Sequence, residues 1–251
     1  MKTIKHYRHA TSVIEIDNKR ILIDPVLGDK GVYPAITNSK NPRKNPLVNL
    51  PAEIEDILDV DGIIITHNHN DHFDIVAKKI LARDVPILCQ EEDYLNFKKL
   101  GFVNLTLVKE KTIWLGIKVQ RFIGTHGGHI FNKKLGVSSS YLLTSTQSKI
   151  YLTGDTLLTI SVIQNLKKIK PNYIIANGGG AKIKMLGKVT MNNKDIDKLA
   201  RLNNNCKIIV VHMDSINHCF DTRVKLFKQC SRGNLVVPLD GEKISFINNK
   251  K

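Results

Sequence analysis

The chain has 251 residues, 42% of them hydrophobic, and a formal net charge of +15 at pH 7. This length suffices for one large domain or two small ones with a substantial core. The apolar runs are far shorter than the roughly 20 residues that span a bilayer, and no apolar stretch follows the basic N-terminus as it would in a secretory signal. We therefore expect a cytoplasmic protein without a membrane segment.

The positive charge comes mainly from lysines that are scattered among asparagines. A run of five or six basic residues, or a basic stripe interleaved with aromatic residues, would favour nucleic-acid binding. The sequence has neither, so nucleic acid is an open but not a favoured partner. A solvated surface accounts for most of the lysines, and a small anionic substrate is the next interpretation. The sequence leaves the oligomeric state undetermined, and a homo-oligomer stays open.

The first part of the chain predicts a β-hairpin followed by a long loop. Apolar and polar residues alternate over 11–16, a turn follows at Asn18–Lys19, and residues 20–24 form the second strand. Residues 28–51 are rich in proline and asparagine and predict an ordered loop. Loops of this length in compact domains are usually functional, so we expect this one to form a lid or one wall of the site.

The rest of the chain alternates predicted strands and helices. A buried strand at 62–66 is followed by a helix that begins at Asp74, a favourable N-cap residue. Further strands are predicted at 85–89, 103–108, 112–114, 117–123, 137–144, 149–153, 173–176, 208–211, 235–237 and 243–247, and further helices at 53–58, 91–100, 160–168, 192–202 and 221–230. This pattern alone indicates an α/β or α+β fold.

The predicted strand at 62–66 leads directly into a cluster of metal-ligating residue types. His67 and His69 are two residues apart, so in extended backbone their side chains point the same way. Asp71 and His72 follow the turn and could serve a second ion. Imidazoles suit zinc, manganese or iron, and a carboxylate adds the negative charge that a divalent ion favours. The cluster therefore predicts a metal site.

The H-x-H-x-D-H pattern at 67–72 resembles the signature of the metallo-β-lactamase superfamily of metallo-hydrolases. Three downstream residues at predicted strand ends fit this resemblance: His126, Asp155 in a Gly–Asp pair, and His212. The resemblance implies an α+β fold, a four-layer αββα sandwich, in a single domain that spans residues 1–251. The opening segments Arg8–Thr11 and Ile21–Pro25 are most similar to the branch that includes ascorbate-phosphate lactonases.

The same resemblance implies a set of seven ligands for two divalent metal ions. The first ion would be held by His67, His69 and His126, the second by Asp71, His72 and His212, and Asp155 would bridge both. Zinc is the expected metal, although manganese and iron favour the same nitrogen and oxygen ligands. Two ions about 3.5–4 Å apart can share a hydroxide that attacks the substrate at neutral pH. Asp71 would then be catalytic as well, by orienting the water or passing a proton to the leaving group.

Several alternatives remain open at single positions. His129 could replace His126, which we prefer because it follows a strand directly and precedes two glycines. His218 competes with His212, which stands at a predicted strand end, and a Cys219 thiolate is a weaker candidate because the other ligands already complete two sites. Gly178–Gly180 lacks the spacing of a nucleotide-binding loop, and we expect these glycines to let the backbone pack closely at the site.

Four residues are candidates for contact with the substrate. His218 would lie beside the last ligand, and Arg8 and His9 would be near the metals because the lactonase-like branch returns its chain start to the site. Arg223 begins a predicted helix and could hold a carboxylate or phosphate through two hydrogen bonds.

Three functions are compatible with these residues. The favoured one is a dinuclear metallo-hydrolase, lactonase- or esterase-like, that opens a lactone or cleaves another ester of a small anionic molecule. The second is a phosphodiesterase or nuclease, which the positive charge would favour. The third is a metal-bound scaffold or sensor without turnover. An open site with seven ligands argues against the third, because structural zinc sites are closed tetrahedra.

Overall fold

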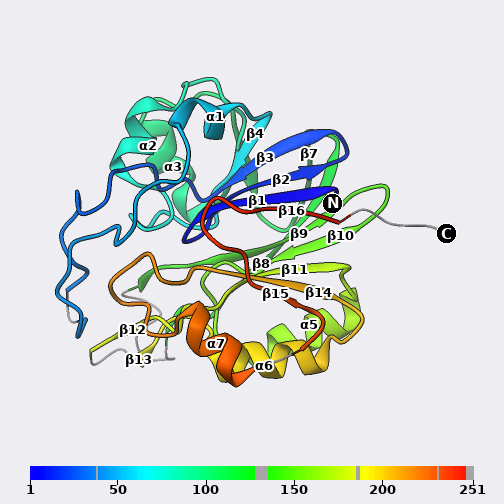
Figure 1. Cartoon of the computed structure of the whole chain (residues 1–251). Helices are drawn as coiled ribbons and strands as arrows, with labels where there is room; N and C mark the ends of the chain where they lie inside the picture. Colours follow the sequence, from blue (N-terminus) through cyan, green and yellow to red (C-terminus); the bar gives the residue numbers. More distant parts are fainter. Residues whose placement is uncertain (38, 128–134, 185–186, 231, 247–251) are drawn as a thin grey trace.

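Two seven-stranded β-sheets stack against each other and carry helices on their outer faces, in a computed structural model that describes residues 1–37, 39–127, 135–184, 187–230 and 232–246 (Figure 1). This four-layer arrangement confirms the predicted αββα sandwich of the α+β class. Among the described residues, no helix is long and apolar enough to cross a membrane.

The first sheet is built from the N-terminal part of the chain and one C-terminal strand. Its order is β16-β1-β2-β3-β4-β5-β6, and its outer face is covered by three helices (Figure 1). The strands are β1 (Thr3–Arg8), β2 (Thr11–Ile16), β3 (Lys19–Ile23), β4 (Gly62–Ile64), β5 (Ile87–Gln90), β6 (Leu105–Val108) and β16 (Lys243–Ser245), and the helices are α1 (Ile54–Leu58), α2 (Ile75–Ile80) and α3 (Glu91–Lys99).

The second sheet has the order β15-β14-β11-β10-β9-β8-β7 and its own covering helices. The strands are β7 (Lys111–Trp114), β8 (Ile117–Ile123), β9 (Ser139–Thr144), β10 (Lys149–Leu152), β11 (Tyr173–Asn177), β14 (Lys207–Val211) and β15 (Leu235–Val236), and the helices are α5 (Ile160–Ile169), α6 (Asn193–Leu202) and α7 (Arg223–Gln229). A separate hairpin joins β12 (Lys182–Ile183) and β13 (Gly187–Lys188).

Hydrophobic side chains fill the three spaces between the four layers. Ile14, Leu143 and Ile209 belong to the cluster between the two sheets, and the two outer clusters pack each sheet against its helices. Side chains of β4 are buried on both faces, as expected for a strand that pairs with parallel neighbours in a sheet covered on both sides. Burial of this apolar surface is the main force that stabilises the sandwich.

Local sequence signals set several of the helix starts. Asp74 accepts a hydrogen bond from the backbone N–H of Ala77, which confirms it as the N-cap of α2. Thr159 caps α5 in the same way, and Asn192 and Asp195 form a capping box at α6. Two elements were missed by the sequence analysis: β1, whose mixed polar and apolar residues hide its period, and the short β12–β13 hairpin.

The ends of several strands meet at one edge of the sandwich. Strand β4 is parallel to β3 and β5, and β10, β11 and β14 are parallel to one another. Strand β8 runs in the same direction as β10 because both are antiparallel to β9. The segments that follow β4, β8, β10 and β14 can therefore meet although they are distant in the sequence.

Arg223 joins the start of α7 to the first sheet and not to a substrate, in contrast to our expectation. Its guanidinium donates to the carbonyl oxygen of Pro238 at 2.8 Å, forms ion pairs with Asp214 at 3.2 Å and with Asp240, and lies 3.2 Å from His6 of β1. The side chain is only 10% exposed. These contacts use its donors to connect both halves of the sandwich.

Replacing Arg223 should therefore lower stability. We expect Arg223→Met to reduce the free energy of unfolding by about 2–4 kcal/mol, because it leaves the partly buried carboxylates of Asp214 and Asp240 without their cation. Lys19→Met removes an exposed pair with Asp61 and should cost less than about 1 kcal/mol. Urea unfolding of both variants measures the difference, and equal effects would contradict a connecting role for Arg223.

Candidate metal centre

Each residue of the predicted ligand set follows the end of a strand at the same edge of the sandwich. His67 to His72 follow β4, His126 follows β8, Asp155 follows β10, and His212 follows β14. The structure brings all seven predicted ligands together, and it adds His9, which lies in the turn between β1 and β2.

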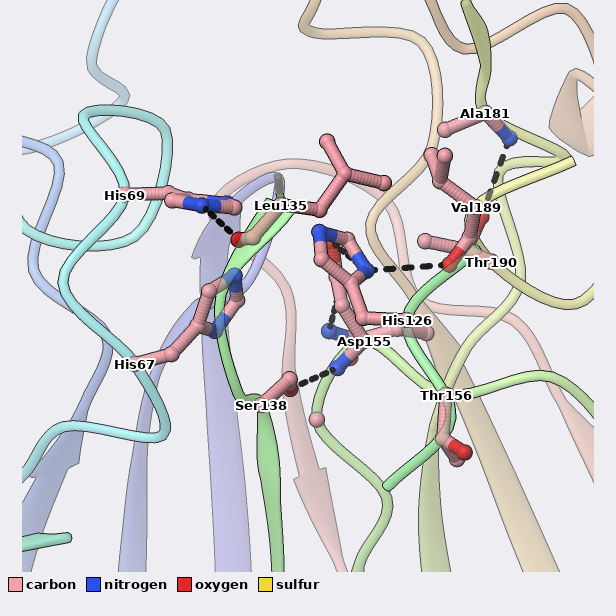
Figure 2. A network of polar contacts seen from close by, with 12 residues as sticks. His67, His69, His126, Leu135, Ser138, Asp155, Thr156, Ala181, Val189 and Thr190 are labelled. Atoms are coloured by element: carbon pink, nitrogen blue, oxygen red, sulfur yellow. Dashed lines mark hydrogen bonds and ion pairs between the residues drawn. The ribbon is translucent and has the colours of Figure 1, made fainter. Parts of the chain in front are cut away.

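Three histidines form the first group of donor atoms. One ring nitrogen from each of His67, His69 and His126 lies within 4.8 Å of the other two. Figure 2 shows the His67 and His69 rings on one side and the His126 ring on the other, with Asp155 close to His126. Three imidazoles that converge in this way can form one face of a metal site.

Asp155 links this group to a second one. Its Oδ1 lies 3.3 Å from His72 Nε2 and 3.4 Å from His212 Nε2, and its Oδ2 lies 4.0 Å from His126 Nδ1. Donor atoms of His72 and His212 also cluster with those of His9 and Asp71 within 4.8 Å. A carboxylate between two groups of imidazoles is an arrangement that could hold a pair of divalent ions.

In three of the rings, one nitrogen donates to a carbonyl or carboxylate oxygen, and the other nitrogen is directed toward the donor groups. His126 Nδ1 donates to the Val189 carbonyl and His69 Nε2 to the Leu135 carbonyl (Figure 2). His72 Nδ1 donates to Asp24. A nitrogen that donates to oxygen carries the proton, so the other nitrogen keeps its lone pair. His67 Nε2 is buried with no hydrogen-bond partner, as a ligand atom would be before the ion binds.

The charge states of these groups also fit a cation. Burial and the neighbouring His72 lower the pKa of His67 well below its usual value, so its ring is neutral. Burial alone would raise the pKa of Asp155, but His212 and His72 outweigh it and hold the carboxylate ionised. Burial would lower the pKa of His72, yet Asp155 and Asp24 raise it well above normal. The two carboxylates therefore create a place where positive charge is stabilised.

A buried carboxylate that the sequence analysis did not select orients the motif. Asp24 Oδ1 accepts from the Thr66 backbone N–H, and its Oδ2 accepts from the Thr66 hydroxyl and from His72 Nδ1 at 2.8 Å. Asp24 follows β3, the parallel neighbour of β4. An aspartate at the end of the strand beside the motif strand is the signal that could have identified it.

The glycines after β11 allow the backbone to approach the last ligand, as predicted. A Cβ on Gly179 would lie 2.0 Å from the carbonyl oxygen of His212 and 3.0 Å from Cys219 Sγ. Cys219 Sγ in turn lies 3.5 Å from His212 Nδ1, the ring nitrogen that does not face the donor group. Cys219 therefore contacts the Nδ1 edge of the His212 ring, and it belongs to none of the metal-ligating groups among the described residues.

A cavity of about 550 Å³ opens onto the centre. His69, Asp71, His126, Asp155 and His218 line it, together with apolar side chains from the loop at 28–51 and from other segments: Val26, Pro34, Ala35, Ile36, Ile75, Leu135, Ile183, Val189 and Ile216. The predicted role of the loop as one wall of the site is thus confirmed.

The predicted substrate contacts lie in different places. His218 faces the cavity, with Nε2 3.7 Å from Asp71 Oδ2, whereas Arg8 and His9 are buried outside the described lining. The Arg8 guanidinium donates to the carbonyl oxygens of Val26 and Val48 at 3.0 Å and to that of Gly28, so it fastens both ends of the long loop. His129 lies outside the described residues.

Comparison with known proteins identifies the family. The family model described as the metallo-beta-lactamase superfamily matches residues 7–205. This chain belongs to the metallo-β-lactamase superfamily. Within the superfamily it is 34% identical to the UPF0173 protein YddR of Bacillus subtilis (strain 168), over 97% of this chain and 99% of that protein. UPF0173 relatives from Pyrobaculum aerophilum and Aeropyrum pernix are named metal-dependent hydrolases.

Two solved structures are similar along nearly the whole chain. An isothiocyanate hydrolase from Delia radicum gut bacteria is 30% identical, with a TM-score of 0.92 over 97% of this chain and 99% of that one. A protein described as a possible metal-dependent hydrolase from Veillonella parvula is also 30% identical, with a TM-score of 0.93 over 98% and 100% of the two chains.

Removing the Asp24 carboxylate should weaken metal binding although Asp24 does not lie among the ligands. We expect Asp24→Ala to lower zinc affinity by about 10- to 100-fold, because His72 loses the partner that fixes its ring and its tautomer. Competition with a zinc chelator measures this. Asp61→Ala is the matched control, since Asp61 lies just before β4 and accepts from Arg20 at the opposite end of the strand. Unchanged affinity in Asp24→Ala would contradict the proposed orientation.

Proposed function

We propose that this chain is a dinuclear metal-dependent hydrolase that acts on a small, uncharged substrate with an electrophilic carbon. The observation that carries the proposal is the joining of two donor groups by Asp155 at the floor of an apolar cavity. His67, His69 and His126 would hold the first ion, Asp71, His72 and His212 would hold the second, and Asp155 would serve both. Zinc suits these donors best, and manganese or iron fits the same set.

The residues around the ions have separate tasks in hydrolysis. Two bound divalent ions supply a water of lowered pKa and polarise the bond under attack. Asp71 faces the cavity and is ionised, since His9 and His72 hold its pKa well below normal although burial alone would raise it. The Asp71 carboxylate can therefore orient the attacking water and pass a proton to the leaving group. His218, 3.7 Å from Asp71, can contact the substrate or the leaving group.

The cavity favours an uncharged substrate over the anionic one that the composition suggested. No lysine or arginine is among the described residues that line it, and half of the lining residues are aliphatic. An anion would lose its hydration there without gaining a cationic side chain. The lysines that produce the charge of +15 are thus not among the described residues at the site. The lack of a cationic side chain in the described lining also disfavours a phosphodiester substrate.

The similar isothiocyanate hydrolase supports this substrate class. An isothiocyanate is a small neutral group with an electrophilic central carbon, and a lactone or other ester offers a comparable carbonyl carbon. We therefore propose isothiocyanates and uncharged lactones or esters as substrates of this chain. The support is the 30% identity over almost the entire length of both proteins together with the apolar lining.

A panel of matched substrates tests the proposed function. We expect zinc-loaded protein to hydrolyse an aryl-alkyl isothiocyanate or a neutral lactone with kcat/KM about 10-fold or more above that for the same lactone carrying a carboxylate. Activity should disappear with a chelator and return with zinc. Preference for the carboxylated lactone or for bis(p-nitrophenyl) phosphate would contradict the substrate class, and no turnover by metal-loaded protein would leave a scaffold or sensor.

A charge introduced into the wall of the cavity is the control for this test. Ile36→Lys places a cation on the partly exposed loop wall and should shift the preference toward the carboxylated substrate. Ile113→Lys adds the same charge at an exposed position of β7 and should leave the preference unchanged. An equal shift in both variants would show that net charge, and not the lining, selects the substrate.

A further inference from the structure

His9 occupies an unusual position in the turn between β1 and β2. Its side chain is fully buried, and neither ring nitrogen has a hydrogen-bond partner. Its backbone has a φ of 54°, in the left-handed region that residues other than glycine rarely adopt. Both features cost free energy, so a purely structural histidine would not be expected here.

The His9 ring faces the second donor group. Its Nε2 lies 3.6 Å from Asp71 Oδ2, and its centroid lies 3.7 Å from that of His212. The His9 carbonyl also accepts a hydrogen bond of 2.6 Å from the His212 backbone N–H, which holds the two residues together. Donor atoms of His9, Asp71, His72 and His212 all lie within 4.8 Å of one another. Ligands that bind the same ion at about 2 Å are roughly 3–4 Å apart, and the 3.6 Å between His9 Nε2 and Asp71 Oδ2 falls in this range.

We propose that His9 is a further ligand of the second metal ion, an inference that rests on the dinuclear centre of the proposed function. The second site then combines three imidazoles with two carboxylates, Asp71 and Asp155. The first site combines three imidazoles with Asp155 alone. The additional donors and the additional negative charge make the second site the tighter of the two.

The position of the cavity agrees with this difference between the sites. Two of the three histidines of the first site, His69 and His126, line the cavity, whereas His9, His72 and His212 are buried outside its described lining. An ion held by the first group would therefore be accessible from the cavity, as the ion of a catalytic site is. The second group would hold its ion mainly through buried imidazoles, and of its proposed ligands only Asp71 and Asp155 line the cavity.

His218 provides a matched comparison for His9. Its Nε2 lies 3.7 Å from Asp71 Oδ2, nearly the same distance as for His9, and its Nδ1 is also buried without a partner. However, His218 faces the cavity and does not belong to a donor group among the described residues. If both histidines only oriented Asp71, their loss would affect the metal centre equally.

The test compares His9→Asn with His218→Asn in the full chain. Asparagine tolerates a positive φ, so it should preserve the turn at position 9. We expect His9→Asn to lower the affinity for the more tightly bound Zn²⁺ by about 100-fold, measured by chelator competition, with His218→Asn within about threefold of the unsubstituted protein. The absorption spectrum of the Co²⁺-loaded protein should change in His9→Asn only, because one nitrogen ligand is lost.

Each outcome separates this inference from the proposed function. If the unsubstituted protein binds fewer than two ions, the dinuclear centre itself is wrong. If it binds two, and His9→Asn binds both with unchanged affinity and spectrum, only the role of His9 is wrong. Equal losses in both variants would also overturn that role. His9→Gly, which adopts the same φ without strain, repeats the test if the asparagine variant proves unstable to heating.

Discussion

The contacts of the buried Asp155 carboxylate are the interaction on which the centre depends. One oxygen faces His72 and His212, and the other faces His126. The side chain of Asn177 donates to Oδ1 at 2.8 Å, and the Ser138 hydroxyl accepts from the Asp155 backbone N–H. An ionised carboxylate inside a protein requires compensating positive charge. The His72 ring, whose pKa is raised, supplies part of it, and the proposed ions would supply the rest.

Fixed supports around the centre connect it to the rest of the sandwich. Asp24 connects the end of β3 to the motif after β4, and Arg8 fastens both ends of the loop at 28–51. Asn217 holds the middle of that loop, since its Oδ1 accepts from the Ile36 backbone N–H at 3.0 Å. The apolar wall is thus attached to β1 and to the segment that carries His218. Substrate selection and metal binding share the same framework.

The sequence predicted the parts of the molecule that local patterns encode. The spacing at 67–72, the apolar strand before it and the N-cap at Asp74 depend on neighbouring residues and can be read directly. Arg8 and Arg223 could not be assigned correctly, because their partners lie 18 or more positions away or on another element. Asp24 was missed for the same reason, because only the pairing of β3 with β4 brings it to the centre. The family resemblance did place His9 near the metals, but its contacts with Asp71 and His212 depend on residues far away in the sequence.

Anomalous diffraction from crystals of the zinc-loaded protein would test the central claim most directly. Data collected at the zinc absorption edge should show two peaks about 3.5–4 Å apart. One peak should lie among His67, His69 and His126, and the other beside Asp71, His72 and His212, with Asp155 between them. One peak alone, or peaks outside these groups, would contradict a dinuclear centre joined by Asp155.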